Sequence, residues 1–194
     1  MRVFAGFLMM AVCGLAAWGE TVVEPSTEES FPAVLKAGDA ELRCTGTSVR
    51  RVYGFNIYAI AHYGDPSAAP AEDVSVEEQL KHWEDSAAAK AMVIRFVFSA
   101  DEGNMRQFAG NSLEEAGYTG ERKEAFLEAF ARDYASGDEA RLVATGDALA
   151  VEINGEAKGT WQDRALATAL WKCWLGDKSV LKDRAGLVSI PVGK

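Results

Sequence analysis

Two adjacent arginines inside a strand-like segment are the residues best suited to chemistry. Arg50 and Arg51 interrupt residues 46–63, which are otherwise rich in β-branched and aromatic side chains. A buried arginine must be paired or hydrogen-bonded, because an isolated charge in an apolar interior is costly. A guanidinium group fits a carboxylate or another oxyanion well, so an anionic ligand would satisfy it. An internal Asp or Glu, or a side chain that reaches solvent, explains the same pattern.

Other catalytic signatures are missing from the sequence. It contains no nucleophile elbow, phosphate-binding loop, zinc-binding helix motif or CxxC pair. The two histidines, His62 and His82, and the two cysteines beyond the N-terminal leader are too few and too dispersed for a metal site. We therefore expect neither a metal nor a cofactor. The formal net charge of −9 repels phosphate backbones, so no nucleic-acid partner is expected.

The same two cysteines, Cys44 and Cys173, allow two interpretations. In an oxidising compartment they could form a disulfide. The sequence does not show whether their Cα atoms come close enough for that bond. Two buried, unpaired thiols are the alternative, and the sequence leaves both open.

The surrounding pattern predicts the elements that position the arginines. Strong β-propensity predicts two strands within residues 41–63, with a turn near Gly54. The remaining expected elements are an edge strand over 31–35, a helix over 75–90, a strand over 92–98, a helix capped by Ser99 and reaching 116, a helix over 121–134, two strands over 141–153, a helix over 161–175 and a short helix over 179–187. Strands and helices come in blocks, which predicts an α+β fold with a largely antiparallel sheet.

The N-terminus has the composition of a secretory signal peptide over residues 1–20. Arg2 supplies the positive charge, an apolar stretch follows, and small residues precede Glu20. The apolar stretch is short for a bilayer span, so we expect no stable membrane span in the mature chain. Residues 21–30 are polar and are expected to be a mobile leader, and residues 31–194 to be one domain. The location predicted by this leader is periplasmic or secreted.

Two motifs make the sequence similar to a known family. A Phe-Pro pair, then Gly-x-x-x-Arg, then Phe-x-x-Tyr-x-x-x-x-Tyr within residues 31–63 resemble the N-terminal half of the chalcone isomerase-like family. Residues 165–180, with Leu-Trp and Trp-Leu-Gly-Asp-Lys-Ser-Val, resemble the C-terminal motif of its bacterial, signal-peptide-bearing branch. The resemblance covers roughly residues 30–188. It implies a chalcone-isomerase-like open-faced β-sandwich, a large antiparallel sheet with helices packed on one side.

The resemblance also implies roles for individual residues. In plant chalcone isomerases, an arginine of the first motif stabilises the phenolate that attacks an unsaturated ketone. Arg50 matches that position best, with Arg51 as the fallback. Tyr58 aligns with a threonine on the enzyme's next strand. In non-catalytic members that bind fatty acids, the same arginine holds the carboxylate.

The enzymes also carry hydrogen-bond donors that this alignment does not find. It places Gly103 and Gly110 where they have a Tyr and an Asn, and Leu166 or Ala167 where they have a polar residue. The reaction needs a positioned cation and donors for the developing enolate. On this alignment the cation is kept and the donors are lost, so the resemblance favours a protein without catalytic residues.

Three functions follow, in order of preference. The first is a non-catalytic, periplasmic chalcone-isomerase-fold protein that binds a small apolar anion such as a fatty acid through Arg50 and Tyr58. The second is an isomerase, an intramolecular lyase acting on an unsaturated phenolic ketone. The third is a structural partner in an envelope complex. For the first, Arg50 is expected at the edge of an apolar cleft, with Arg51 on the opposite side of the strand.

Overall fold

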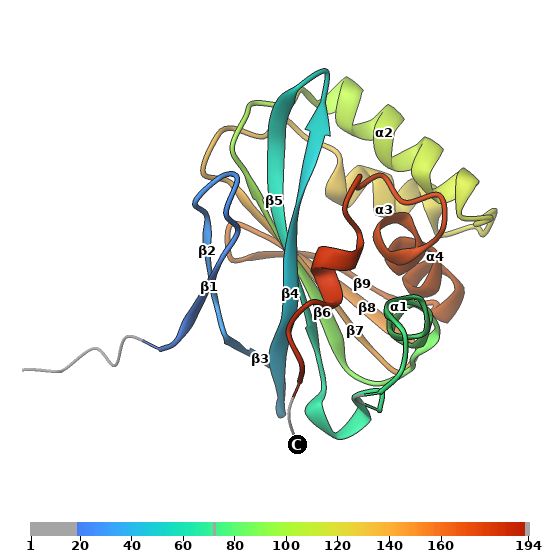
Figure 1. Cartoon of the computed structure of the whole chain (residues 1–194). Helices are drawn as coiled ribbons and strands as arrows, with labels where there is room; N and C mark the ends of the chain where they lie inside the picture. Colours follow the sequence, from blue (N-terminus) through green and yellow to red (C-terminus); the bar gives the residue numbers. More distant parts are fainter. Residues whose placement is uncertain (1–18, 72, 193–194) are drawn as a thin grey trace, which may run out of the picture.

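Seven antiparallel strands form one curled sheet (Figure 1). The structure, a computed structural model, describes residues 19–71 and 73–192. The sheet order follows the chain, through β3 (Val34–Ala37), β4 (Ala40–Val52), β5 (Phe55–Gly64), β6 (Lys90–Phe96), β7 (Glu139–Thr145), β8 (Ala148–Ile153) and β9 (Glu156–Gln162). Each strand pairs with its sequence neighbours, so the connections are hairpins or helical excursions. The expected α+β fold with a largely antiparallel sheet is confirmed.

In the described part of the chain, four α-helices cover one face of the sheet (Figure 1). They are α1 (Val76–Asp85), α2 (Glu102–Glu115), α3 (Lys123–Phe130) and α4 (Arg164–Leu175), with short 3₁₀ turns at Pro66–Ala68 and Ala185–Val188. Their apolar sides and the inner face of the sheet enclose the main core, in which Trp83, Trp171 and Phe126 are fully buried. Within the described part of the chain, no helix has the length and apolar character needed to span a membrane.

A hairpin of β1 (Thr21–Val23) and β2 (Ser30–Pro32) lies on the other side of the sheet (Figure 1). Residues 21–30 were expected to be a mobile leader, but the Glu24 carboxylate organises their turn. It accepts hydrogen bonds from the backbone N–H of Ser26 and Thr27. Phe31, fully buried, anchors this hairpin in a second, smaller core. Most of the expected signal peptide, residues 1–18, lies outside the described residues.

Two other local expectations need correction. Asp101 rather than Ser99 caps α2, because its carboxylate accepts the hydrogen bond from the Asn104 backbone N–H at 2.9 Å. The helix expected over 179–187 is reduced to the 3₁₀ turn at Ala185–Val188. Before that turn, two β4 side chains bind backbone carbonyls of the segment: Arg50 donates to that of Val180 and Ser48 to that of Asp183.

Cys44 and Cys173 are both buried and unpaired. Cys44 belongs to the smaller core and Cys173 to the main core, on opposite faces of the sheet. The sheet therefore separates the two thiols. Burial raises the pKa of Cys44 to about 11 and that of Cys173 to about 12, so both are inert thiols at neutral pH.

Candidate functional site

A cleft of about 490 Å³ opens between the free end of the β4–β5 hairpin and α2. Its size falls within the range of small-molecule pockets. β4 and β5 form one wall of the cleft, and one face of α2 forms the opposite wall. Residues 98–101, which follow β6, line the cleft between these walls. The lining residues are Arg50, Val52, Tyr53, Ile57, Tyr58, Phe98, Ser99, Ala100, Asp101, Asn104, Met105, Gln107, Phe108 and Asn111.

Arg50 is half-buried and lies at the edge of this cleft. Its Nη1 donates a hydrogen bond to the backbone carbonyl of Val180. Its guanidinium carbon lies 5.5 Å from the centre of the Phe108 ring, within the range of a cation–π contact. No carboxylate of the described residues lies within 4.0 Å of it. Its neighbours are therefore neutral, and its charge is free to attract an anion.

Tyr58 lies beside Arg50, a relation that strand parity alone could not establish. The two residues are directly opposed in the β4–β5 register. The Tyr58 side chain is buried, and its hydroxyl accepts a hydrogen bond from Trp174 Nε1 at 3.1 Å. Burial raises the pKa of Tyr58 to about 12, although the nearby Arg50 charge opposes this shift. The hydroxyl is thus protonated at neutral pH and can donate to an oxyanion in the cleft.

A β-bulge separates the two neighbouring arginines. Arg50 opposes Tyr58, but Arg51 opposes Asn56, which leaves Ile57 without a partner in the ladder. Arg51 is exposed, and its Nε donates to Asn56 Oδ1 at 2.9 Å. Asn56 in turn donates to the carbonyl of Ser26 in the β1–β2 hairpin, on the far side of the sheet. Arg50 alone therefore faces the cleft.

The sequence alignment missed three amide side chains on α2. Asn104, Gln107 and Asn111 line the cleft, while Gly103 does not and buried Gly110 packs toward Leu127 of α3. The helix therefore does present polar side chains to the cleft, at positions other than the two glycines. Spacing of three and four residues puts these amides on one helix face, and that pattern was visible in the sequence.

The charge around the cleft is asymmetric. Arg50 occupies the sheet side, and Asp101 occupies the opposite rim at the start of α2. The backbone N–H of Asn104 lowers the pKa of Asp101, which keeps it negative. An anionic group entering the cleft is therefore favoured beside Arg50 and disfavoured at the α2 rim.

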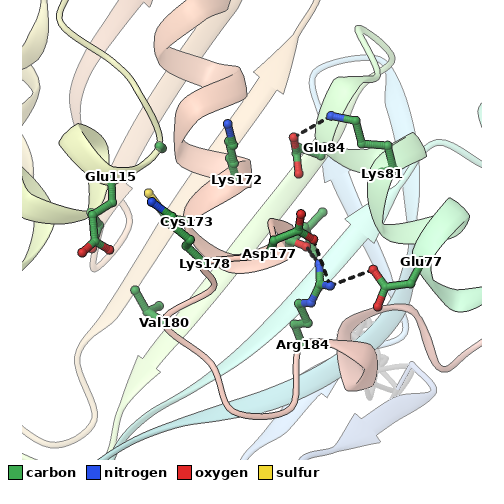
Figure 2. A pocket seen from close by; sticks show the side chains of 13 residues that line it. Glu77, Lys81, Glu84, Glu115, Lys172, Cys173, Asp177, Lys178, Val180 and Arg184 are labelled. Atoms are coloured by element: carbon green, nitrogen blue, oxygen red, sulfur yellow. Dashed lines mark hydrogen bonds and ion pairs between the residues drawn. The ribbon is translucent and has the colours of Figure 1, made fainter.

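A second cavity, of about 380 Å³, lies on the other side of the 176–184 segment and is lined mostly by charged side chains (Figure 2). Arg184 forms ion pairs with Glu77 at 2.7 Å and Asp177 at 3.2 Å, and it donates to the carbonyl of Leu175 at 2.6 Å. These contacts tie the end of α4 to the start of α1. The charged side chains that line this cavity thus form a network that holds residues 176–184 in place.

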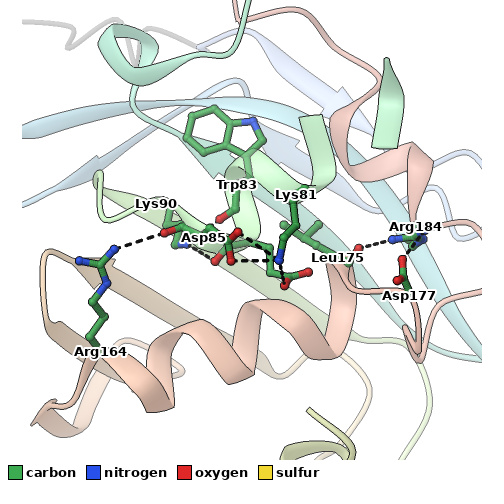
Figure 3. A network of polar contacts seen from close by, with 9 residues as sticks. Lys81, Trp83, Asp85, Lys90, Arg164, Leu175, Asp177 and Arg184 are labelled. Atoms are coloured by element: carbon green, nitrogen blue, oxygen red, sulfur yellow. Dashed lines mark hydrogen bonds and ion pairs between the residues drawn. The ribbon is translucent and has the colours of Figure 1, made fainter. Parts of the chain in front are cut away.

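The network continues beneath α1 (Figure 3). Lys81 pairs with Glu84 at 2.9 Å, and buried Lys90 donates to the carbonyls of Trp83 and Glu84. Lys90 Nζ also lies 5.0 Å from the centre of the Trp171 ring of α4. Burial lowers the pKa of Lys90 to about 7. These contacts hold α1, α4 and the sheet together without touching the cleft.

The same 176–184 segment is also held against β4. Ser48 Oγ donates a hydrogen bond to the carbonyl of Asp183 at 2.6 Å. Ser48 lies two residues before Arg50 on β4, and Arg50 contacts Val180 of the same segment. Gly46, two residues before Ser48, leaves room for the backbone, since a Cβ there would lie 2.0 Å from the carbonyl oxygen of Gly186. One face of β4 thus receives the C-terminal segment, and Arg50 lies where that contact meets the cleft.

Comparisons with known proteins agree with this fold. The model of a family described as chalcone isomerase-like matches residues 26–184. A solved structure of a fatty-acid binding protein from Arabidopsis thaliana is similar, with 19% sequence identity and a TM-score of 0.71. The similarity covers 88% of this chain and 96% of that one. No curated protein sequence matches this chain.

Proposed function

The chain belongs to the chalcone isomerase-like family, and we propose that it is a non-catalytic member that binds a small apolar anion such as a fatty acid. One observation carries the proposal: Arg50 lies at the edge of a largely apolar cleft and has no carboxylate partner among the described residues. Tyr58 supplies a protonated donor beside it. The similar fold of a fatty-acid binding protein supports the same ligand class.

In this arrangement the ligand carboxylate contacts the Arg50 guanidinium and the Tyr58 hydroxyl. The apolar portion contacts the side chains of Ile57, Met105 and Phe108, which line the cleft. A charge-assisted hydrogen bond in a partly dehydrated site is stronger than one between neutral groups. The cleft therefore favours an ionised acid over an uncharged molecule of the same shape.

Displacement of a fluorescent polyene fatty acid tests this preference. Palmitate is expected to displace the probe at least about tenfold more tightly than its methyl ester, which lacks the charge. Equal affinities for the acid and the ester, or no probe binding at all, would remove the basis of the proposal.

An isomerase is the second candidate, and a specific observation favours keeping it. Asn104, Gln107 and Asn111 present amide groups across the cleft from Arg50. Such donors could stabilise a developing enolate, as the chemistry of an unsaturated phenolic ketone requires. We expect no cyclisation of hydroxychalcones, followed by absorbance. Turnover within about a hundredfold of a genuine chalcone isomerase would establish the isomerase instead.

Export is part of the proposal, with membership of the bacterial signal-peptide-bearing branch and a periplasmic location. It rests on the positive charge, apolar stretch and small residues of the first 20 positions. N-terminal sequencing of protein from the native envelope is expected to find a start between about Ala17 and Thr21. Intact Met1 in a cytoplasmic fraction would contradict it. A purely structural envelope role, the third candidate, predicts an exported protein that binds no apolar anion.

A further inference from the structure

The exposed aromatic side chains of the described residues gather at the mouth of the cleft. Six large hydrophobic residues of the described chain are exposed. Three of the six are aromatic, namely Tyr53, Phe55 and Phe98. Tyr53 and Phe98 line the cleft, and the Phe55 and Phe98 rings lie 5.9 Å apart. We call these three residues the aromatic rim. The free end of the β4–β5 hairpin, which carries two of them, stands at the edge of the fold next to α2 (Figure 1).

The backbone gives no local reason for an aromatic residue at Tyr53. Tyr53 and Gly54 both have positive φ, 50° and 89°, as in the two central residues of a type I′ turn. Asn-Gly is the preferred pair for this turn, and the β8–β9 hairpin uses Asn154 and Gly155 with φ of 52° and 79°. A tyrosine in the left-handed region is strained. Its side chain is 98% exposed, so packing does not compensate for this strain.

The charge of the hairpin differs from that of the whole chain. Between Arg43 and Asp65 the charged residues are Arg50 and Arg51, whereas the chain has a formal net charge of −9. Arg51 is exposed near the free end of the hairpin, where its Nε donates a hydrogen bond to Asn56 Oδ1. The acidic residues near the mouth, Asp101 and Glu102, lie on the opposite rim at the start of α2. Exposed Arg51 thus shares the hairpin side of the mouth with the rings of Tyr53 and Phe55.

We propose that the aromatic rim docks the protein on a lipid bilayer surface, so that the apolar ligand passes between bilayer and cleft without entering bulk water. Exposed rings next to an exposed arginine fit the apolar–polar boundary of a bilayer, with the rings among the acyl chains and the Arg51 guanidinium at the phosphates. A lipid phase is also where a sparingly soluble amphiphile resides. The inference rests on the proposed ligand cleft, because the rim borders it.

Flotation with vesicles made from equal parts of phosphatidylcholine and phosphatidylglycerol tests the docking. The wild-type protein is expected to float, and less so with phosphatidylcholine alone or in high salt. Tyr53→Asn and Phe55→Thr should each weaken the partition by about tenfold, because each withdraws one ring from the bilayer. Tyr53→Asn also creates the preferred turn pair, so its melting temperature should be unchanged or raised. A loss of flotation in this variant therefore cannot be attributed to unfolding.

Val34→Thr is the matched control. Val34 is also an exposed apolar residue, but it opposes Arg43, about 30 Å along β4 from the aromatic rim. The Val34→Thr variant should bind to the vesicles as strongly as the wild-type protein does. A wild type that does not float, or flotation that is unaffected by both rim variants, would overturn the proposal. So would concentration-dependent dimerisation that is lost in the rim variants while flotation is not.

Transfer of the fluorescent fatty acid from vesicles completes the test. Docking predicts a transfer rate that rises with vesicle concentration and falls several-fold in Phe55→Thr. Phe55 does not line the cleft, so the affinity of this variant for the probe in solution should stay unchanged. A rate independent of vesicle concentration would show passage through water and refute docking. If the protein does not bind the probe in solution without vesicles, the proposed ligand cleft is wrong. If it binds the probe in solution but does not float with vesicles, only the docking proposal is wrong.

Discussion

Replacing Arg50 with methionine removes the guanidinium at the edge of the cleft and keeps much of the apolar length of the side chain. In the protein without ligand, the change eliminates one hydrogen bond to the Val180 carbonyl and one contact with the Phe108 ring. Because no carboxylate is left without its partner, the expected loss of stability is about 1–2 kcal/mol. For a chain of this length that corresponds to a decrease in melting temperature of about 2–8 °C.

The effect on ligand binding should be larger. Truncating one member of a buried charged pair costs about 2–5 kcal/mol, or about 30-fold to several thousand-fold in affinity. Probe displacement by palmitate measures that loss, and thermal unfolding of the same variant measures the stability. Arg51→Met is the matched control, since Arg51 is exposed on the other side of the strand and should leave affinity unchanged. Unchanged palmitate affinity in Arg50→Met, together with a lowered melting temperature, would show that Arg50 only holds the C-terminal segment.

Three further predictions concern groups around the core. Tyr58→Phe should weaken palmitate binding by about five- to tenfold, the effect of one hydrogen bond. It should also destabilise the fold modestly, because Trp174 Nε1 loses its acceptor. A loss of palmitate affinity greater than that of Arg50→Met would contradict these roles. The depressed pKa of Lys90, about 7, means that the unfolded chain binds more protons above that pH, so the free energy of unfolding should rise from pH 7 to 9, and this slope should flatten in Lys90→Met. Cys44 and Cys173 should resist a thiol reagent in the native protein and both react after unfolding without reductant, whereas thiols that stay blocked would reveal a disulfide.

Much of the fold could be predicted from local patterns. The turn near Gly54 and the one at Asn154–Gly155 join strands as expected, because Gly54, Asn154 and Gly155 adopt positive φ at low cost, whereas Tyr53 does not. Most of the helix expected over 161–175 is present as α4, because its apolar residues recur at helical spacing and pack against the sheet. It begins at Arg164, since Trp161 and Gln162 still belong to β9. Arg50 was identified by its residue type, since a cation in a strand-like apolar segment requires a partner.

The identity of that partner was decided by tertiary structure. Val180 is 130 residues away along the chain, and only the packing of the C-terminal segment on β4 brings its carbonyl to Arg50. Likewise, the rotation of α2 about its axis, set by burial of Met105 and Leu113, determined that amides rather than glycines face the cleft. The bulge at Ile57 set Tyr58 opposite Arg50. Sequence periodicity identifies the elements because it reflects interactions between near neighbours, whereas the cleft depends on register and rotation fixed by contacts far apart in the chain.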